Sequence, residues 1–174
     1  MKKLLLLSFS ISMFITTLNA QMTFAERFLP QWQRSMEYTL EVAELMPEKF
    51  YHDQPTADTK SFYDQIKHLI ENFINLQAYV SHNKDIELSK RNLDDLSKKE
   101  LLAILKEAFS YISVLAENTP EEELNKKVDF FVLNVDMDKA GIFMLIRNHL
   151  THHRAELIVY LRLKEIKPPR FVGW

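Results

Sequence analysis

Two histidines, His149 and His153, stand four residues apart in a stretch whose apolar residues recur at helical spacing. At about 100° per residue, both fall in the middle of the stripe formed by Ile142, Ile146 and Leu157, which a folded helix would bury. Side chains four apart point the same way, with Cβ atoms about 5–6 Å apart, so both rings could bind one metal ion. Buried imidazoles need partners, so the pair is either part of a metal site or a pair of core histidines bonded to hydroxyls or carbonyls.

Two familiar metal motifs do not fit this pair. Leu150 stands where the helical motif of zinc proteases needs its glutamate base. A di-iron site of the ferritin type needs a glutamate three residues before a histidine on two helices. The residues three before His149 and His153 are Ile146 and Leu150. If these histidines bind metal, we therefore expect a single ion rather than a di-iron pair.

A third ligand would have to come from another helix, and His68 is the best candidate. The chain has no cysteine, so only His, Asp or Glu can hold a metal ion. His68 lies beside the apolar stripe of its own helix, on a flank with Gln65 and Asn72; a histidine in such a place can equally be structural. His52 and His82 lie in or beside loops and are expected to be solvated.

Two further polar residues flank the predicted ligands. Glu156 falls near the apolar face, three residues after His153. It could orient a ligand, act as a fourth ligand or serve as the base that takes a proton from bound water, or it could be a rim carboxylate paired with Arg or Lys. His152 falls on the flank of the same helix and could have a supporting role beside the metal.

Four stretches with apolar residues at helical spacing predict four amphipathic helices. The second and third open with Ser61 and Ser97, each followed three residues later by an acidic residue that favours a capping box. Pro30 is expected in the first turn of the first helix, where its missing N–H costs nothing. Helices of this length predict an all-α four-helix bundle. Their expected bounds are 30–45, 61–82, 97–115 and 138–164.

The segment 126–137 fits this pattern least well. It is rich in β-forming residues, yet the chain offers no other stretch of this kind to pair with it. We expect a long connection whose Phe130 and Val132 pack against the bundle. Just before it, residues 119–122 combine a capping threonine, a proline and glutamates, which indicates a short helical turn.

The first twenty residues resemble a secretory signal peptide. A short basic start is followed by an apolar run over 4–14 and a more polar end with small Ala20. We expect cleavage after Ala20, a mature bundle domain over 21–174, and a secreted or periplasmic protein without membrane attachment. The alternative is an uncleaved membrane anchor, but the run is short of the about 20 residues that a spanning helix needs.

Composition limits the partners. Apolar residues make up 47% of the chain, and only two residues are glycine, which favours a packed helical core. Of the 22 lysines and arginines, two lie in the expected leader, which leaves 20 against 24 acidic residues and a mature charge of −4. This mildly acidic balance argues against nucleic acid as a partner. The absence of cysteine excludes disulfides and thiolate nucleophiles.

The sequence around the histidine pair resembles the DinB family (DinB/YfiT-like metalloenzymes). The strongest stretch is NHLTHHRAEL at 148–157, followed by VYLR at 159–162 and a Pro-Pro end at 168–169. A second stretch runs from LMPE at 45–48 to His68. Together they cover about residues 24–169, weakly over 84–137. The resemblance implies a four-helix bundle with a three-histidine metal site, carried over as His68, His149 and His153.

The chain departs from the family pattern in two ways. Ala155 and Glu156 replace the family's common Gly-Gln pair, which changes the charge beside the metal. The leader would place this member outside the cytoplasm, whereas some family members resemble thiol transferases that use cytoplasmic low-molecular-weight thiols. An exported member could lack that co-substrate.

Three neutral imidazoles would leave one divalent ion its full charge and at least one open position, as in catalytic zinc sites. Zinc, nickel, manganese and iron all accept such ligands. The leading hypothesis is a metal-dependent hydrolase or thiol transferase that acts on a small molecule. The alternatives are a non-catalytic, metal-stabilised bundle that binds a ligand or protein partner, and a metal-free helical interaction domain. A homodimer is compatible with each.

Overall fold

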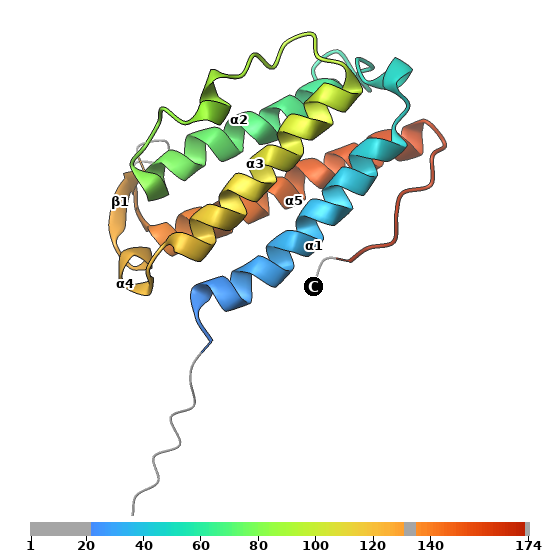
Figure 1. Ribbon diagram of the computed structural model, residues 1–174. Coiled ribbons are helices and arrows are strands. Elements are labelled where there is room, and N and C mark those ends of the chain that lie inside the picture. The colour runs from blue at the N-terminus through green and yellow to red at the C-terminus, as the bar shows by residue number, and fades with distance from the viewer. Residues whose placement is uncertain (1–21, 131–134, 173–174) are drawn as a thin grey trace, which may run out of the picture.

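The computed structural model describes residues 22–130 and 135–172, and these residues are mostly helical, as predicted (Figure 1). The expected signal peptide lies outside the described residues. The four long helices are joined by two 3-10 turns, one short helix and one β-hairpin. Their bounds are α1 (Phe24–Leu45), η1 (Glu48–Phe50), α2 (Phe62–Ser81), η2 (Glu87–Lys90), α3 (Lys98–Asn118), α4 (Glu121–Leu124), β1 (Lys127–Phe130), β2 (Val135–Asp138) and α5 (Lys139–Leu163).

The long helices pack as a bundle around one apolar core. Helices α1 and α2 each pack against both α3 and α5. Trp32 is fully buried at the centre, where its ring contacts Phe73 and Phe109 and its indole N–H donates to the Phe109 carbonyl at 3.1 Å. Buried aromatic rings of this size dominate the packing energy of a small core, so they fix how the four helices sit together.

The start of the first helix differs from the prediction. Helix α1 begins at Phe24, and Thr23 and Glu26 form a complete capping box before it. Phe24 and Phe28 are buried and extend the apolar stripe by more than a turn beyond the predicted start. Pro30 therefore lies inside the helix rather than in its first turn. The predicted caps at Ser61 and Ser97 are confirmed.

The prediction that residues 126–137 lack a partner strand is wrong. Strands β1 and β2 pair with each other in an antiparallel hairpin, with Phe130 opposite Val135. The β-rich run folds back on itself, so it needs no second stretch elsewhere in the chain. Phe130 is buried and packs edge-on against Tyr79 of α2, as expected, whereas Val132 lies outside the described residues.

Helices α2 and α5 form the pair that carries the predicted ligands. They run in opposite directions, so the start of α2 lies beside the end of α5 (Figure 1). The hydroxyl of Tyr160 near the end of α5 donates to the Lys60 carbonyl just before α2, at 2.7 Å. None of the helices in the described part of the chain is long and apolar enough to span a bilayer.

Candidate metal centre

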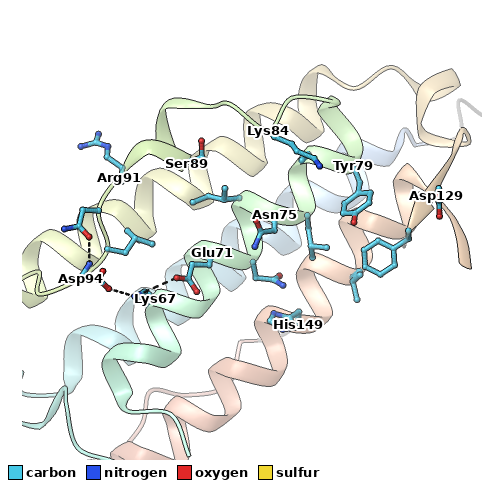
Figure 2. Close-up of a pocket in the computed structure, with 18 residues that line it drawn as sticks. Lys67, Glu71, Asn75, Tyr79, Lys84, Ser89, Arg91, Asp94, Asp129 and His149 are labelled. Atoms are coloured by element: carbon cyan, nitrogen blue, oxygen red, sulfur yellow. Dashed lines mark hydrogen bonds and ion pairs between the residues drawn. The ribbon is translucent and has the colours of Figure 1, made fainter. Parts of the chain in front are cut away.

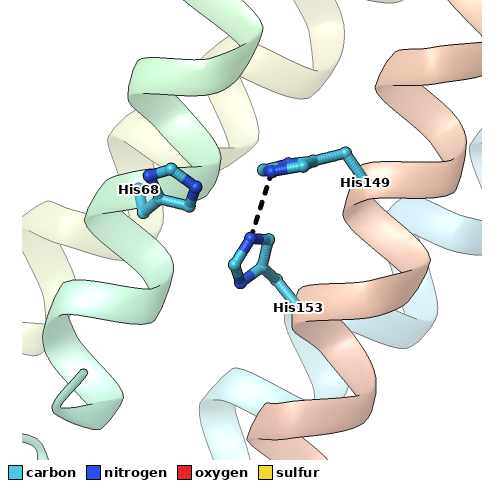
Figure 3. A group of neighbouring side chains, drawn as sticks. All are labelled: His68, His149 and His153. Atoms are coloured by element: carbon cyan, nitrogen blue, oxygen red, sulfur yellow. Dashed lines mark hydrogen bonds between the residues drawn. The ribbon is translucent and has the colours of Figure 1, made fainter. Parts of the chain in front are cut away.

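The structure brings His68, His149 and His153 together, although His68 is far from the other two in sequence (Figure 3). One ring nitrogen from each lies within 4.8 Å of the others. The centroid of the His68 ring lies 5.1 Å from that of His149 and 4.6 Å from that of His153. The centroids of the His149 and His153 rings lie 4.4 Å apart. The three rings form a group that could hold a metal ion.

The His149 and His153 rings on α5 face each other through their Nε2 atoms. Nε2 of His149 lies 3.1 Å from Nε2 of His153. Two nitrogens that bind one tetrahedral zinc ion at about 2.0–2.1 Å lie roughly 3.3 Å apart. The observed separation fits a shared ion, and it also fits a hydrogen bond between two neutral rings.

A hydrogen-bond chain fixes the orientation of His153. Its Nδ1–H donates to Oε1 of Gln65, with 2.6 Å between the heavy atoms. The amide nitrogen of Gln65 lies 3.4 Å from the hydroxyl of Tyr160, which in turn donates to the Lys60 carbonyl. With the proton on Nδ1, the lone pair of Nε2 points toward the other two histidines. Such partners on the far ring nitrogen set the tautomer of metal-binding histidines.

The second ring on α5 has no such partner among the described residues. Nδ1 of His149 is buried and makes no hydrogen bond, and the same is true of Oδ1 of Asn72 on α2. Buried polar atoms without partners are rare in folded proteins. Both residues line the same pocket.

Burial keeps the three rings neutral at pH 7. Burial lowers the pKa of His153 to about 3, with the neighbouring His149 and His68 adding to the effect. Burial is also the main cause that lowers the pKa of His149, to about 4, and the charges of His68 and His152 lower it further. Burial and then Lys60 lower the pKa of His68. Neutral imidazole is the form that binds metals, so this set needs no deprotonation to accept an ion.

Two pockets adjoin the histidine group. The larger, of about 1280 Å³, includes His149 in its lining, and the smaller, of about 370 Å³, includes His68. Lys67 and Glu71 line both pockets. In Figure 2, His149 lies at the α5 edge of the larger pocket, with the Lys67–Asp94 pair at one end and the hairpin at the other. A small molecule in these pockets would therefore contact His149 and His68, whereas His153 lines neither pocket.

The remaining predicted polar residues lie around this centre. His152 is exposed, and its ring packs edge-on against His153 at 4.9 Å. Glu156 is half-buried on α5 and is not part of the lining of the two pockets. His52 and His82 are exposed, as expected.

Sequence reasoning missed two residues at this centre. Glu71 lies one helical turn after His68 and lines both pockets, and Gln65 lies one turn before it. The spacings of three on either side of His68 place all three on one face of α2. That periodicity could have found them, once α2 was known to face α5.

The sequence profile of the DinB family matches residues 16–172 of this chain, which is nearly its whole length. The chain belongs to the DinB family. The predicted resemblance is thus confirmed. Among curated proteins, a search finds none that matches this DinB-family chain.

Two solved structures share its fold. A DinB-like protein (YjoA) from Bacillus subtilis is 18% identical, with a TM-score of 0.68, and the match covers 83% of this chain and 96% of that one. A DinB-like protein from Bacillus cereus is 16% identical, with a TM-score of 0.72, and the match covers 84% and 97%. At these identities, the likeness concerns the arrangement of the helices.

Proposed function

We propose that this DinB-family chain binds one divalent metal ion through His68, His149 and His153 and acts with it on a small molecule. The observation that carries the proposal is the convergence of three neutral ring nitrogens within 4.8 Å of one another, beside two pockets. Zinc, nickel, manganese or iron would suit these ligands. The reaction is hydrolysis or the transfer of a thiol compound.

The three histidines fit such an ion because they are neutral and already oriented. A bound divalent ion would supply Lewis acidity and lower the pKa of a coordinated water or thiol. The chain supplies the geometry: Gln65 holds the ring of His153, and the packing of α2 against α5 brings His68 to the same point. Because the donor set is made of three neutral side chains, the full positive charge of the ion would act on the substrate.

A general base would move a proton at such a site, and two glutamates are candidates. Glu71 lines both pockets and lies one turn after His68, so it can approach a molecule bound there. Glu156, one of whose possible roles from the sequence is that of the base, lies one turn after His153 on α5. We favour Glu71 as the base and Glu156 as a residue that orients the α5 ligands. Glu71→Gln should then lower turnover far more than Glu156→Gln.

The proposed location and partners rest on the sequence. The leader over residues 1–20 supports export and a secreted or periplasmic site of action, with cleavage after Ala20. The acidic balance of the mature chain supports a small-molecule substrate rather than nucleic acid. A homodimer is compatible with this proposal.

Metal analysis of the purified mature protein tests the proposal. Elemental analysis should find about one divalent ion per chain, and His68→Ala should lose it. His52→Ala is the matched control, because His52 is exposed and lies outside the ring cluster. A protein that stays metal-free after incubation with zinc, nickel, manganese and iron would overturn the proposal. Metal binding without turnover in esterase, amidase and thiol-transfer screens would instead support a non-catalytic, metal-stabilised bundle.

A further inference from the structure

The two pockets beside the histidines differ in chemistry. Near His149, the larger pocket is lined by apolar side chains from three elements, α2, β1 and α5. The smaller pocket beside His68 is lined mainly by polar and charged residues. The first set is Leu76, Tyr79, Phe130 and Leu145; the second includes Gln54, Asp58, Thr59, Lys60 and Asp64.

Most side chains of the apolar set are fixed by packing against the rest of the fold. Leu76 and Phe130 are buried, and the rings of Tyr79 and Phe130 pack edge-on at 5.0 Å. Leu145 is half-buried one turn before His149 on α5. We name this set the apolar wall. It offers a preformed surface for carbon atoms directly beside one of the three rings, as ligand pockets usually do.

The nearby cations are engaged with carboxylates of the chain. Lys67 forms ion pairs with Asp94 and, at 4.0 Å, with Glu71. Arg91 pairs with Glu107 at 3.2 Å. The lining of the larger pocket also includes Lys84, so its three cations face three carboxylates, those of Glu71, Asp94 and Asp129. The two charges balance, and a strongly charged ligand is not favoured there.

We infer that the substrate carries a neutral alkyl or aryl body beside its reacting polar group. This inference rests on the proposed metal function. The polar group would lie at the three histidines, and the body would lie against the apolar wall. Each methylene that leaves water for such a surface favours binding by about fourfold. The hairpin takes part because β1 contributes Phe130 to the wall.

Hydroxamic acids test this inference without knowledge of the reaction, since their head group binds metal ions. Acetohydroxamate, octanohydroxamate and benzohydroxamate would be titrated into the zinc- or cobalt-loaded protein by calorimetry. We expect the octyl and phenyl compounds to bind at least about tenfold more tightly than the acetyl compound. Equal affinities for all three would overturn the inference and leave the metal function standing. Failure of every hydroxamate to bind the loaded protein would count against the open metal site itself.

Two substitutions on α5 test whether the alkyl body of the ligand binds at the apolar wall. Leu145→Ser should remove most of the advantage of the octyl compound and leave acetohydroxamate binding unchanged. Val159→Ser is the matched control, because Val159 is 46% exposed on the same helix and lies outside the pocket. An equal effect of the two substitutions, or no effect of either, would show that the body of the ligand lies elsewhere and would contradict the assignment to the apolar wall.

A separate observation concerns the two buried polar atoms without partners. If Nε2 of His149 binds a metal ion, the ring proton must sit on Nδ1, which then needs an acceptor. Neither Nδ1 of His149 nor Oδ1 of Asn72 is accessible to solvent, so bulk water cannot satisfy them. Asn72 lies one turn after His68, and both Asn72 and His149 line the larger pocket.

The geometry points to Asn72 as the positioning residue for His149, in the same way that Gln65 positions His153. In this arrangement, Nδ1–H of His149 would donate to Oδ1 of Asn72. Helix α2 would then supply one ligand, His68, and one amide on either side of it, each directed at a different ring of α5. The pattern follows from the antiparallel pairing of the two helices.

Metal affinity and ring tautomer test this assignment. Asn72→Leu should weaken zinc or cobalt binding by about 10–100-fold, whereas Asn72→Asp should retain it because the carboxylate still accepts. Gln33→Leu, at an exposed site on α1 outside both pockets, is the control. Nitrogen NMR of the zinc-loaded protein should show the proton of His149 on Nδ1. Wild-type affinity in Asn72→Leu, or a His149 ring bound through Nδ1, would overturn the assignment while the metal site stands.

Discussion

The amide oxygen of Gln65 lies 2.6 Å from Nδ1 of His153, and this contact joins the two helices at the candidate metal centre. Gln65→Leu keeps the size of the side chain but removes the acceptor. We expect metal affinity to fall by about 10–100-fold, because the ring of His153 loses the partner that sets its tautomer. Competition with a chelator of known affinity measures this change.

Gln33→Leu provides the control for that substitution, since Gln33 is exposed on α1 and bonds only to Glu37 at 2.8 Å among the contacts of the described residues. Its metal affinity should equal that of the wild type. If Gln65→Leu also binds with wild-type affinity, the contact with His153 has no part in metal binding.

Removal of the metal should lower the thermal stability of the protein. An ion that binds only the folded state stabilises it by about 2.7 kcal/mol at a free concentration of 100 times Kd. Because the ligands come from α2 and α5, the ion joins two helices that are far apart in sequence. Calorimetry with and without a chelator should therefore show a Tm difference of several degrees, and His149→Ala should abolish that difference.

The metal-free protein should lose stability in mild acid. Burial lowers the pKa of His153 to about 3 and that of His149 to about 4 in the folded state, against about 6.5 in an unfolded chain. The unfolded state thus binds more protons below pH 6.5, so stability is complete above that pH and falls as the pH drops toward 4. The slope is at most about 1.4 kcal/mol per pH unit for each histidine.

Urea unfolding of the chelated protein between pH 7 and pH 4.5 measures this slope. A His153→Phe variant, in which a neutral ring replaces the buried imidazole, should show a shallower dependence on pH. An identical pH dependence in the variant would mean that His153 does not contribute to it.

Arg154 should matter for stability and not for metal binding. It is buried directly after His153, with its guanidinium 4.9 Å from the centroid of the Tyr38 ring and 3.4 Å from the hydroxyl of Thr39. These contacts hold α5 against α1, and burial lowers the pKa of the guanidinium. Arg154→Ala should reduce the free energy of unfolding by about 1–3 kcal/mol, as measured in urea. Arg162→Ala, exposed on the same helix, should change it by less than about 0.5 kcal/mol.

The histidine pair of the candidate metal centre could be predicted because its signal is local. His149 and His153 follow the same period as the apolar face of their helix, and Ser97 with Glu100 marks a helix start by its own chemistry. His68 was the best remaining histidine on another helix, and the family resemblance supported that choice. By contrast, the start of α1 depends on whether Thr23 or Pro30 opens the helix, and the Thr23 cap is used because Phe24 and Phe28 find core partners in Phe143.

The residues that sequence reasoning missed depend on which helices face each other. Gln65 and Glu71 are ordinary polar residues on the flank of α2, and they lie at the histidine group only because α5 lies opposite. The hairpin was missed for a related reason, since one β-rich run supplies both strands. Tertiary pairing, rather than propensity, determines these features.

The distance in sequence between His68 and His153 has a consequence for when the ion can bind. A growing chain has no complete set of three histidines until residue 153 has been made and α5 has packed against α2, so the proposed ion could gain all three ligands only at that point. In an exported chain, that stage would take place after translocation. The supply of ions in that outer compartment, as much as the intrinsic preference of imidazole, would then decide which metal the protein carries.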